Sequence, residues 1–404
     1  MNGTNLNGNS DDQPAARLRG AMVDRLAAAG VLDDPKWREA FLAVPRHRFV
    51  PAFFQPVSGG GFRAVSDETD PDQWLGEVYS DEPLVTQLDG HLNAEAACPT
   101  AKTVYGTATC SSSQPSLVAL MLHHLDVRDG AIVLEIGSGT GETGGRLCER
   151  LGASNVTSIE VDADLAATAA KHLDGLGYAP TLIIGDGGDG WPAGAPYDRL
   201  IATCGFPAVP VAWLTQVTPG GRIVVNLYRP LSAGVLAVLD VRGDGSASGH
   251  FARTWAGFMP TRSFQDHGAV KLYESVDRDA IGDGRDTAIG PDALDGGRDA
   301  GKSGFRLLAS LTVPVHLMTV TPEDGPAEDW LLCDDGSYAR HIAGRVAEGG
   351  PRKLWTELEA AHQTWTTLGR PGREAFGLTV GPDGNHILWH GDEHGWSVPI
   401  GASS

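Results

Sequence analysis

The chain has 404 residues, of which 41% are hydrophobic and 20% are charged, so it is long enough and apolar enough for about two or three folded domains. Its formal net charge of −20 argues against nucleic acid and membranes as partners, because a negative field repels phosphate groups. Five widely spaced cysteines without a Cys-x-x-Cys pair argue against a disulfide framework. No apolar run reaches the roughly 18 residues of a membrane-spanning helix, and the loose tail at residues 1–13 lacks the features of a secretory signal. These features predict a cytoplasmic protein.

Strand and helix patterns alternate through the middle of the chain. Helical spacing begins at residue 15, a second short helix is expected over 37–44, and residues 57–110 carry only short apolar pieces, which predicts an irregular stretch. Further helices are expected at 116–125, 143–151, 165–176 and 211–217, with strands at 132–136, 156–160, 181–184, 199–203, 222–227 and 231–241. This alternation predicts βαβ units around a parallel sheet, a doubly wound α/β fold.

The last part of the chain has a different pattern. Residues 275–304 are rich in Gly and Asp, with few large apolar residues, and are expected to form a flexible segment. A strand-like run follows at 305–320, then a helix near 354–368 and hairpin strands over 376–400. The sequence therefore predicts a main domain at 14–240 and a smaller α+β domain at 241–404.

A glycine-rich turn follows the apolar strand at 132–136. Its residues are Gly137, Ser138, Gly139, Thr140 and Gly141. Glycine permits a tight turn and lets backbone N–H groups approach a ligand closely. With Gly144 the turn overlaps the G-x-G-x-x-G pattern of dinucleotide sites, so the motif alone leaves three interpretations open: a nicotinamide dinucleotide, a sulfonium nucleoside or a purely structural turn.

Acidic residues near the turn distinguish these ligands. Glu160 ends the next strand, about 20 residues on, where a carboxylate can hold both ribose hydroxyls. Asp186 and Gly187 follow the strand after that, where they can contact an adenine edge, and Glu135 lies inside the first motif, near the expected methionine group. No Arg or Lys stands in the turn to meet a phosphate. The set favours S-adenosyl-L-methionine as the cofactor.

Several motifs, in order, resemble those of the protein-L-isoaspartate O-methyltransferase family. They lie at 42–51 (LAVPRHRFVP), 79–84 (YSDEPL), 113–115 (SQP), the glycine-rich turn, 185–187, 190–191, 195–198 and 219–222. The resemblance covers about residues 15–230. It implies a class I, Rossmann-like S-adenosyl-L-methionine methyltransferase domain that methylates a peptide carboxylate.

The resemblance implies that Ser113 is the catalytic residue. Its hydroxyl would donate a hydrogen bond to an acceptor carboxylate, which has a pKa near ~4 and needs no base, and would align it with the sulfonium methyl. Taken alone, the residue is more typical of a cap for the helix that begins at 116; the motifs around it favour the active site. Further substrate contacts are expected from Ser112, Gln114, Cys204 and Phe206.

The chain also departs from the compact family pattern. Stretches at about 57–78 and 88–108 are expected insertions, and a long region follows from 231 to 404. Because a repair enzyme for any damaged peptide needs no recognition domain, this region predicts a dedicated acceptor. The long form resembles methyltransferases that act on an Asp of a ribosomally made, macrocyclic precursor peptide, whose methyl ester collapses to an aspartimide. General protein-L-isoaspartate repair is the alternative.

Other patterns are expected to carry no site. Residues 296–303 match the P-loop pattern, but no apolar strand precedes them and an extended run is expected after them. His386, His390, Asp392 and His394 alternate about a glycine turn, as solvated residues do, so no metal site is predicted. An amine or nucleic-acid methyltransferase would carry a [DN]-P-P-[FYW] segment where this chain has Cys-Gly-Phe-Pro at 204–207. Core packing is expected for Trp330, Trp355, Trp365, Trp389 and Trp396, with a peptide-binding surface as the alternative. The oligomeric state is left open.

Overall fold

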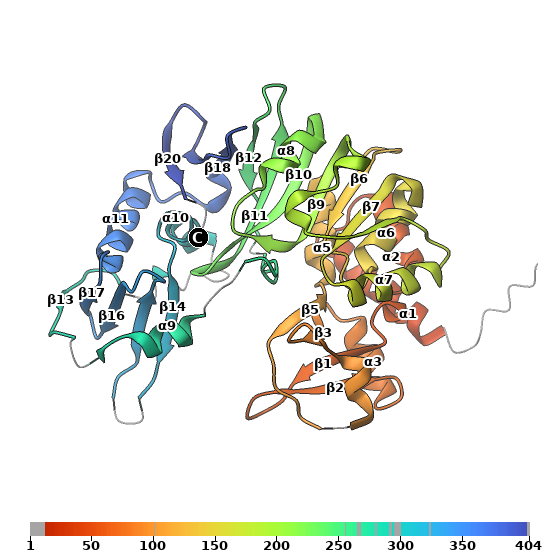
Figure 1. Cartoon of the computed structure of the whole chain (residues 1–404), viewed down its shortest axis with the longest axis horizontal. Helices are drawn as coiled ribbons and strands as arrows, with labels where there is room; N and C mark the ends of the chain where they lie inside the picture. Colours follow the sequence, from red (N-terminus) through yellow and green to blue (C-terminus); the bar gives the residue numbers. More distant parts are fainter. Residues whose placement is uncertain are drawn as a thin grey trace, which may run out of the picture. The chain divides into compact units, whose positions relative to one another are not determined.

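Two units make up the chain, Met1–Thr203 and Cys204–Ser404 (Figure 1). The computed structural model describes residues 13–100, 102–254, 256–264, 268–278, 281–290, 293–294, 300–322 and 325–401. Within these ranges no helix is both long enough and apolar enough to cross a membrane. Each unit is described by itself below.

The first unit runs from α1 into β9. Its elements are α1 (Gln13–Ala28), α2 (Pro35–Ala43), η2 (Arg46–Arg48), β1 (Ala52–Pro56), β2 (Phe62–Ser66), α3 (Pro71–Val78), β3 (Leu84–Leu88), β4 (Leu92–Asn93), α4 (Ala94–Ala97), η3 (Cys98–Thr100), β5 (Ala108–Ser112), α5 (Pro115–Leu125), β6 (Val133–Ile136), α6 (Glu142–Leu151), η4 (Ala153–Asn155), β7 (Val156–Glu160), α7 (Ala163–Asp174), β8 (Thr181–Ile184), η5 (Gly187–Asp189), η6 (Pro192–Gly194) and β9 (Tyr197–Phe206).

A parallel sheet forms the centre of this unit. Its strands lie in the order β9-β6-β7-β8, and each neighbouring pair is parallel. Every residue of β6 and β7 is buried, because helices that connect parallel strands cover both faces of the sheet. The predicted α/β fold with alternating strands and helices is confirmed.

A second, smaller sheet occupies the stretch that was expected to be irregular. Its strands follow the order β2-β1-β3-β4, and β5 pairs with β3; Figure 1 shows it in orange beside α3. Phe54, Leu88, Ala94 and Cys98 are among the residues of its own buried cluster. The expectation of an irregular stretch over 57–110 is therefore wrong. Short antiparallel strands bury only one face, so they leave no long apolar run in the sequence.

The second unit holds six antiparallel strands of a larger sheet and a separate five-stranded antiparallel sheet. Its elements are α8 (Val211–Gln216), β10 (Val217–Arg229), β11 (Ser232–Val241), β12 (Ala247–Phe251), α9 (Ala269–Ser275), β13 (Arg285–Asp286), α10 (Ala300–Thr312), β14 (His316–Val320), β15 (Glu328–Leu332), β16 (Tyr338–Ile342), β17 (Arg345–Gly349), α11 (Leu354–Thr367), η9 (Arg373–Ala375), β18 (Phe376–Val380), β19 (His386–His390) and β20 (Trp396–Ile400).

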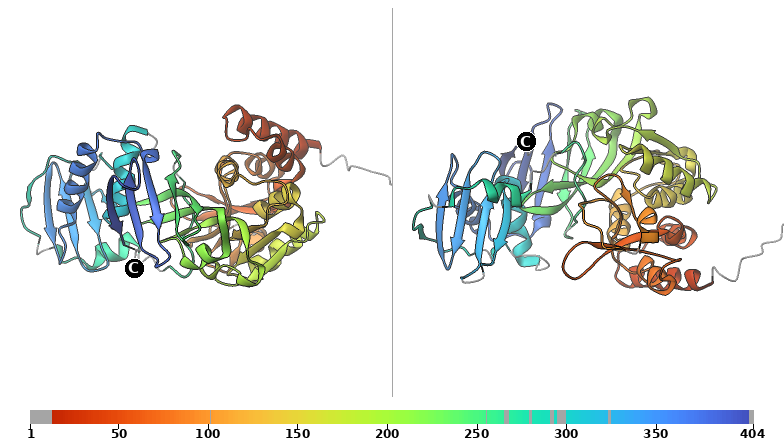
Figure 2. Two further views of the ribbon diagram at one scale, coloured as in Figure 1. Left: turned by 90° about the horizontal axis from the view of Figure 1, so that it is seen from above. Right: turned by 60° about the horizontal axis from the view of Figure 1, so that its bottom comes forward.

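Strands β10 and β11 join this unit's first sheet. That sheet has the order β20-β19-β18-β12-β11-β10, and both views of Figure 2 show β18 to β20 side by side in dark blue. The predicted hairpin strands over 376–400 are confirmed. The boundary between the compact units lies at residue 203 rather than at the predicted domain boundary of 240, because β10 and β11 form a long hairpin that continues into β12.

The second sheet has the order β13-β17-β16-β15-β14 and lies beside α10 and α11 in the chain's second unit. The strand-like run expected over 305–320 is wrong in its first part, which is helix α10, and right for β14. Phe305, Leu308 and Leu311 are buried on one face of α10, and a short apolar run fits a helix as well as a strand. A helix therefore begins within the P-loop-like pattern and continues after it, where an extended run was expected; residues 295–299 lie outside the described part of the chain.

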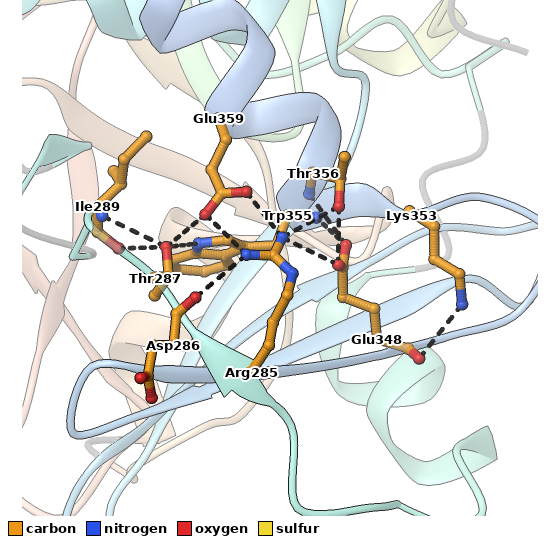
Figure 3. Close-up of polar contacts among 9 residues, drawn as sticks. All are labelled: Arg285, Asp286, Thr287, Ile289, Glu348, Lys353, Trp355, Thr356 and Glu359. Carbon is orange, nitrogen blue, oxygen red and sulfur yellow. Dashed lines mark hydrogen bonds and ion pairs between the residues drawn. The ribbon is translucent and has the colours of Figure 1, made fainter.

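Part of the predicted flexible segment is fixed on α11 (Figure 3). Two guanidinium nitrogens of Arg285 donate to the carboxylate of Glu359, at 3.0 and 2.7 Å. The Thr287 hydroxyl donates to the same carboxylate at 2.6 Å. Glu348 begins the helix by accepting the backbone N–H of Trp355 at 2.7 Å. Residues 279–280, 291–292 and 295–299 of the predicted segment lie outside the described residues.

The tryptophans of the second unit pack mainly inside it. Trp330, Trp355, Trp365 and Trp389 are buried, and Trp396 is half-buried. Core packing is thus confirmed for the first four.

Candidate active site

The glycine-rich turn connects β6 to α6 and depends on its glycines. Gly137, Gly139 and Gly141 have φ values of 89°, 52° and 89°, a region that other residues rarely adopt. A Cβ at Gly141 would lie 3.2 Å from the Cβ of Ala169. The turn is closed by a hydrogen bond from the Gly141 N–H to the Ser138 carbonyl at 2.8 Å, so glycine is required both for the backbone and for the close approach to α7.

Glu135 is fully buried in β6, directly before the turn. Its Oε2 accepts a hydrogen bond from the Ser158 hydroxyl at 2.6 Å, and Ser158 also shares a 2.6 Å bond with the Ser138 hydroxyl. The Oε1 of Glu135 is buried and has no hydrogen-bond partner in the described part of the chain. Burial raises the pKa of this carboxyl to about 8, because a low-dielectric environment disfavours the charged form.

Glu160 ends β7 and lies against the same turn. Its Oε2 accepts the backbone N–H of Gly139 at 2.9 Å, and its Oε1 accepts that of Asp162 at 3.2 Å. Asp162 then caps α7 by accepting the N–H of Asp164 at 2.9 Å. The carboxylate that sequence reasoning assigned to ribose is therefore already oriented by two backbone groups.

Asp186 and Gly187 follow β8 at the same end of the parallel sheet. Asp186 is exposed, and its Oδ1 accepts the N–H of Gly188 at 2.8 Å. A Cβ at Gly187 would lie 2.2 Å from a methyl carbon of Ile136, so only glycine fits there. The structure thus brings residues after β6, β7 and β8 to one edge of the sheet, as expected for parallel strands. Thr140 is buried at this edge, and its carbonyl accepts a bond from His172.

Ser113 lies between β5 and α5, and its hydroxyl does not cap the helix. The cap position is Gln114, without a side-chain capping bond. The carboxylate of Asp81 caps the helix from outside it. One of its oxygens accepts the backbone N–H of Ser116 at 2.8 Å, and the other accepts the side-chain amide of Gln114 at 3.3 Å. The Ser113 hydroxyl forms no hydrogen bond with another described residue and is half-buried. The capping interpretation of Ser113 is therefore wrong.

Strand β5 carries Ser113 to the glycine-rich turn. A Cβ at Gly139 would lie 3.6 Å from the sulfur of Cys110 and 3.8 Å from the Ser111 carbonyl oxygen. Both residues belong to the last part of β5. The turn that ends in Ser113 and the glycine-rich turn are therefore neighbours within the first unit.

The other predicted substrate contacts have different surroundings. Ser112 was expected to contact the substrate. Its side chain is instead buried, and its hydroxyl donates to Glu142 at 2.5 Å. Cys204 and Phe206 belong to the second unit; Cys204 is half-buried, and the buried Phe206 ring packs edge-on against Trp213 at 4.7 Å. Their roles in substrate binding stay predictions.

Sequence reasoning missed three charged residues around Ser113. Arg46 and Glu142 are buried beside it, and Asp81 begins the helix that follows it. Arg46 and Asp81 lie in the motifs at 42–51 and 79–84, which is the signal that could have found them. Glu142 directly follows the glycine-rich turn and had no such signal.

One histidine of the C-terminal hairpin, His386, is held by two hydrogen bonds. His386 is buried, and its ring nitrogens contact the Val209 N–H at 2.9 Å and the Gly384 carbonyl at 2.8 Å. Over the residues that the structure describes, no three His, Cys, Asp or Glu side chains are grouped as metal ligands.

Comparison with known proteins gives the chain its family. The family profile described as Protein-L-isoaspartate(D-aspartate) O-methyltransferase matches residues 89–259. A protein-L-isoaspartate O-methyltransferase of Methanopyrus kandleri is 32% identical over 218 residues, which are 53% of this chain and 79% of that protein. Its counterpart from Methylorubrum extorquens is 32% identical over 54% of this chain and 77% of that protein.

A solved structure shows the same fold. A protein-L-isoaspartate O-methyltransferase aligns with 93% of this chain and 100% of its own, with a TM-score of 0.53 and 21% identity. This likeness concerns the fold alone. The sequence relatives, matched at 32% identity over more than three quarters of their length, show that the chain belongs to the protein-L-isoaspartate O-methyltransferase family and is an S-adenosyl-L-methionine-dependent carboxyl O-methyltransferase.

Proposed function

We propose that the chain methylates an Asp or isoaspartyl carboxylate of a peptide, with Ser113 as the residue that holds the acceptor. The observation that carries this proposal is the position of β5, whose last residues contact Gly139. It leaves the unbonded hydroxyl of Ser113 beside the turn that would hold the methyl donor.

The residues around the turn fit S-adenosyl-L-methionine. Glycines bring backbone N–H groups close to a ligand, and the side chains available are carboxylates, which suit a cationic ligand. Each oxygen of Glu160 accepts one backbone bond and has a lone pair left for a ribose hydroxyl. We assign the ribose to Glu160, the adenine edge to Asp186 and Gly187, and the methionine end to the turn at Gly137–Gly141 above Glu135. When bound, the cofactor supplies an electrophilic methyl group.

Ser113 would act by orientation rather than by proton removal. An acceptor carboxylate with a pKa near ~4 is ionised at neutral pH, so its oxygen needs no base. The Ser113 hydroxyl would donate to one carboxylate oxygen, which leaves the other free to point at the methyl group, and would replace part of the water shell. The product is a methyl ester.

The ester can then close to a succinimide. The backbone nitrogen of the next residue attacks the ester carbonyl carbon, the carbon–methoxy bond breaks, and the amide proton leaves with the methoxide as methanol. An ester favours this step because methoxide is a better leaving group than the oxide of a carboxylate.

Two acceptor classes remain, and each has an observation in its favour. A dedicated acceptor, an Asp of a ribosomally made macrocyclic precursor peptide, is favoured by the size of the second unit, which includes a separate five-stranded sheet. General isoaspartyl repair is favoured by the relatives' names and by the fold likeness over 93% of the chain. We place the dedicated peptide first, since this additional sheet exceeds what methyl transfer needs.

Mass spectrometry of methyl transfer from isotopically labelled S-adenosyl-L-methionine tests both. The acceptors are a linear peptide with one isoaspartate and the modified precursor peptide encoded beside the gene. Methylation of the precursor alone, followed by loss of methanol, supports the dedicated enzyme; efficient methylation of the linear peptide alone supports repair and overturns it.

The variant Ser113→Ala tests the site in the same assay. We expect kcat to fall about 100-fold, since loss of one orienting contact costs this order of rate, with an unchanged affinity for the cofactor. Ser116→Ala, one helical turn away, is the matched control and should keep full activity. Equal activity of Ser113→Ala and the control would remove Ser113 from the mechanism.

A further inference from the structure

One buried arginine holds the turn that carries Ser113. Arg46 is 0% exposed, and its guanidinium group reaches two distant segments. It donates to the carbonyls of Val78 (2.9 Å), Ser80 (3.3 Å), Glu82 (3.0 Å), Ser112 (3.4 Å) and Ser113 (3.1 Å), and to the hydroxyl of Ser112 (3.2 Å). A planar group with five fixed donors can join several carbonyls in this way, whereas a lysine ammonium cannot.

A buried carboxylate connects the same turn to the cofactor side. Glu142 is the first residue of α6 and directly follows Gly141. Its Oε2 accepts the Ser112 hydroxyl at 2.5 Å and lies 3.4 Å from the Nε of Arg46. Its Oε1 pairs with Arg146, one helical turn further along α6. One carboxylate therefore contacts both the helix that begins at the glycine-rich turn and the turn before Ser113.

This cluster is charged although it is buried. Burial lowers the pKa of both Arg46 and Arg146, while the charge of Glu142 raises it. Two cations and one anion without access to water are costly, and a hydrophobic cluster of the same size is often as stable. Its hydrogen bonds, by contrast, fix the directions of particular carbonyl groups around Ser113.

We propose that Arg46 is a positioning residue for Ser113, and that Glu142 sets the distance between the acceptor turn and the glycine-rich turn. The inference rests on the proposed role of Ser113. No described residue gives the Ser113 hydroxyl a side-chain partner, so its place is determined by its backbone, and Arg46 binds the carbonyl of that backbone. Any movement of Arg46 therefore moves the acceptor relative to the methyl donor.

A double-mutant cycle between Arg46 and Ser113 tests this. Arg46→Lys keeps the positive charge but loses the planar guanidinium group that bonds several carbonyls at once. Ser112→Ala removes the hydroxyl that joins Arg46 to Glu142. In the wild-type background we expect each to lower kcat about 10- to 100-fold, as a displacement of about 1 Å does, while calorimetric affinity for S-adenosyl-L-homocysteine stays within about threefold. In the Ser113→Ala background each should lower kcat by less than about threefold, because a residue that acts through Ser113 has nothing left to position.

Arg150→Lys is the control: this arginine lies on α6 and pairs with Asp129, and its substitution should leave kcat unchanged in both backgrounds. The inference would be overturned if Arg46→Lys and Ser112→Ala lowered kcat by the same factor in the Ser113→Ala background as in the wild type. Equal factors would indicate a general loss of stability, which lowers kcat in every background. Should Arg46→Lys fail to fold by circular dichroism, Ser112→Ala alone decides. An unchanged kcat of Ser113→Ala would instead contradict the proposed function, so the two failures are distinguishable.

Discussion

The buried carboxyl of Glu135 makes the stability of the fold depend on pH. Its carboxyl is buried below the glycine-rich turn, and burial raises its pKa from 4.5 to about 8. Between these two values the folded protein binds more protons than the unfolded chain. Stability from this group is therefore present at low pH and is lost as the pH rises toward 8.

The substitution Glu135→Gln should raise stability at high pH. A neutral amide of the same shape still accepts the Ser158 bond and avoids a buried charge. We expect the free energy of unfolding at pH 9 to exceed that of the wild type by roughly 1–3 kcal/mol, with little difference at pH 5. Urea unfolding at both pH values measures this, with the exposed Glu39→Gln as control. The same difference at both pH values would contradict a charge effect.

The places of residues with a local pattern follow from the sequence, whereas the contacts that residues make across the fold do not. The glycines of the turn, Glu160 and Ser113 stand at positions that strand ends and motif order define. Arg46 bonds to Ser112 and Ser113, which lie more than 60 positions away in the sequence. A periodic pattern of apolar residues cannot predict such a contact. Ser112 shows the same limit, because only the fold separates its buried hydroxyl from that of Ser113.

At the scale of elements, a hydrogen bond of His386 connects β19 to Val209, just before α8. Its Nε2 accepts the Val209 N–H, and its Nδ1 donates to the Gly384 carbonyl, so the ring is neutral in the fold. Burial lowers the pKa of His386 below its ordinary 6.5. The unfolded chain therefore binds more protons, and stability is lost as the pH falls below about 6.5.

We expect His386→Gln to reduce this pH dependence. The wild type should lose roughly 2–4 °C more than the variant in unfolding midpoint between pH 7.5 and 5. Scanning calorimetry at the two pH values gives the comparison, with the half-buried His390→Gln as a control on the same strand. Parallel curves for wild type and His386→Gln would show that this ring does not titrate with unfolding.

Elements were predictable where strand patterns alternate with helix patterns along the chain. The strands β6 and β7 follow from short runs of β-favouring residues at regular spacing between helical patterns. The small sheet was missed because β1 to β5 are separated by turns and short helices, and α10 was misassigned because Phe305 to Leu311 fit two periods. The neighbouring pattern, rather than the length of each strand, decided which elements the sequence could show.

For the whole molecule, the net charge of −20 predicts which acceptors bind well. A cationic peptide approaches a negative protein faster and binds more tightly at low ionic strength. We expect the KM of a Lys-rich isoaspartyl peptide to rise about three- to tenfold between 20 and 300 mM salt, while that of a Gln-substituted peptide stays constant. Steady-state methylation assays measure the KM of each peptide at both salt concentrations. An equal rise in KM for the two peptides would show that the salt effect does not come from peptide charge.

The small sheet has a consequence for how such enzymes diversify. Because its core is filled by its own side chains, the turn at 57–61 on its rim can change in length and sequence without moving the end of β5. Surface turns tolerate such change far better than strands do. Natural selection can therefore remodel the outer margin of this sheet while the methyl-transfer geometry is inherited intact, so that new acceptors and an old chemistry evolve at different rates.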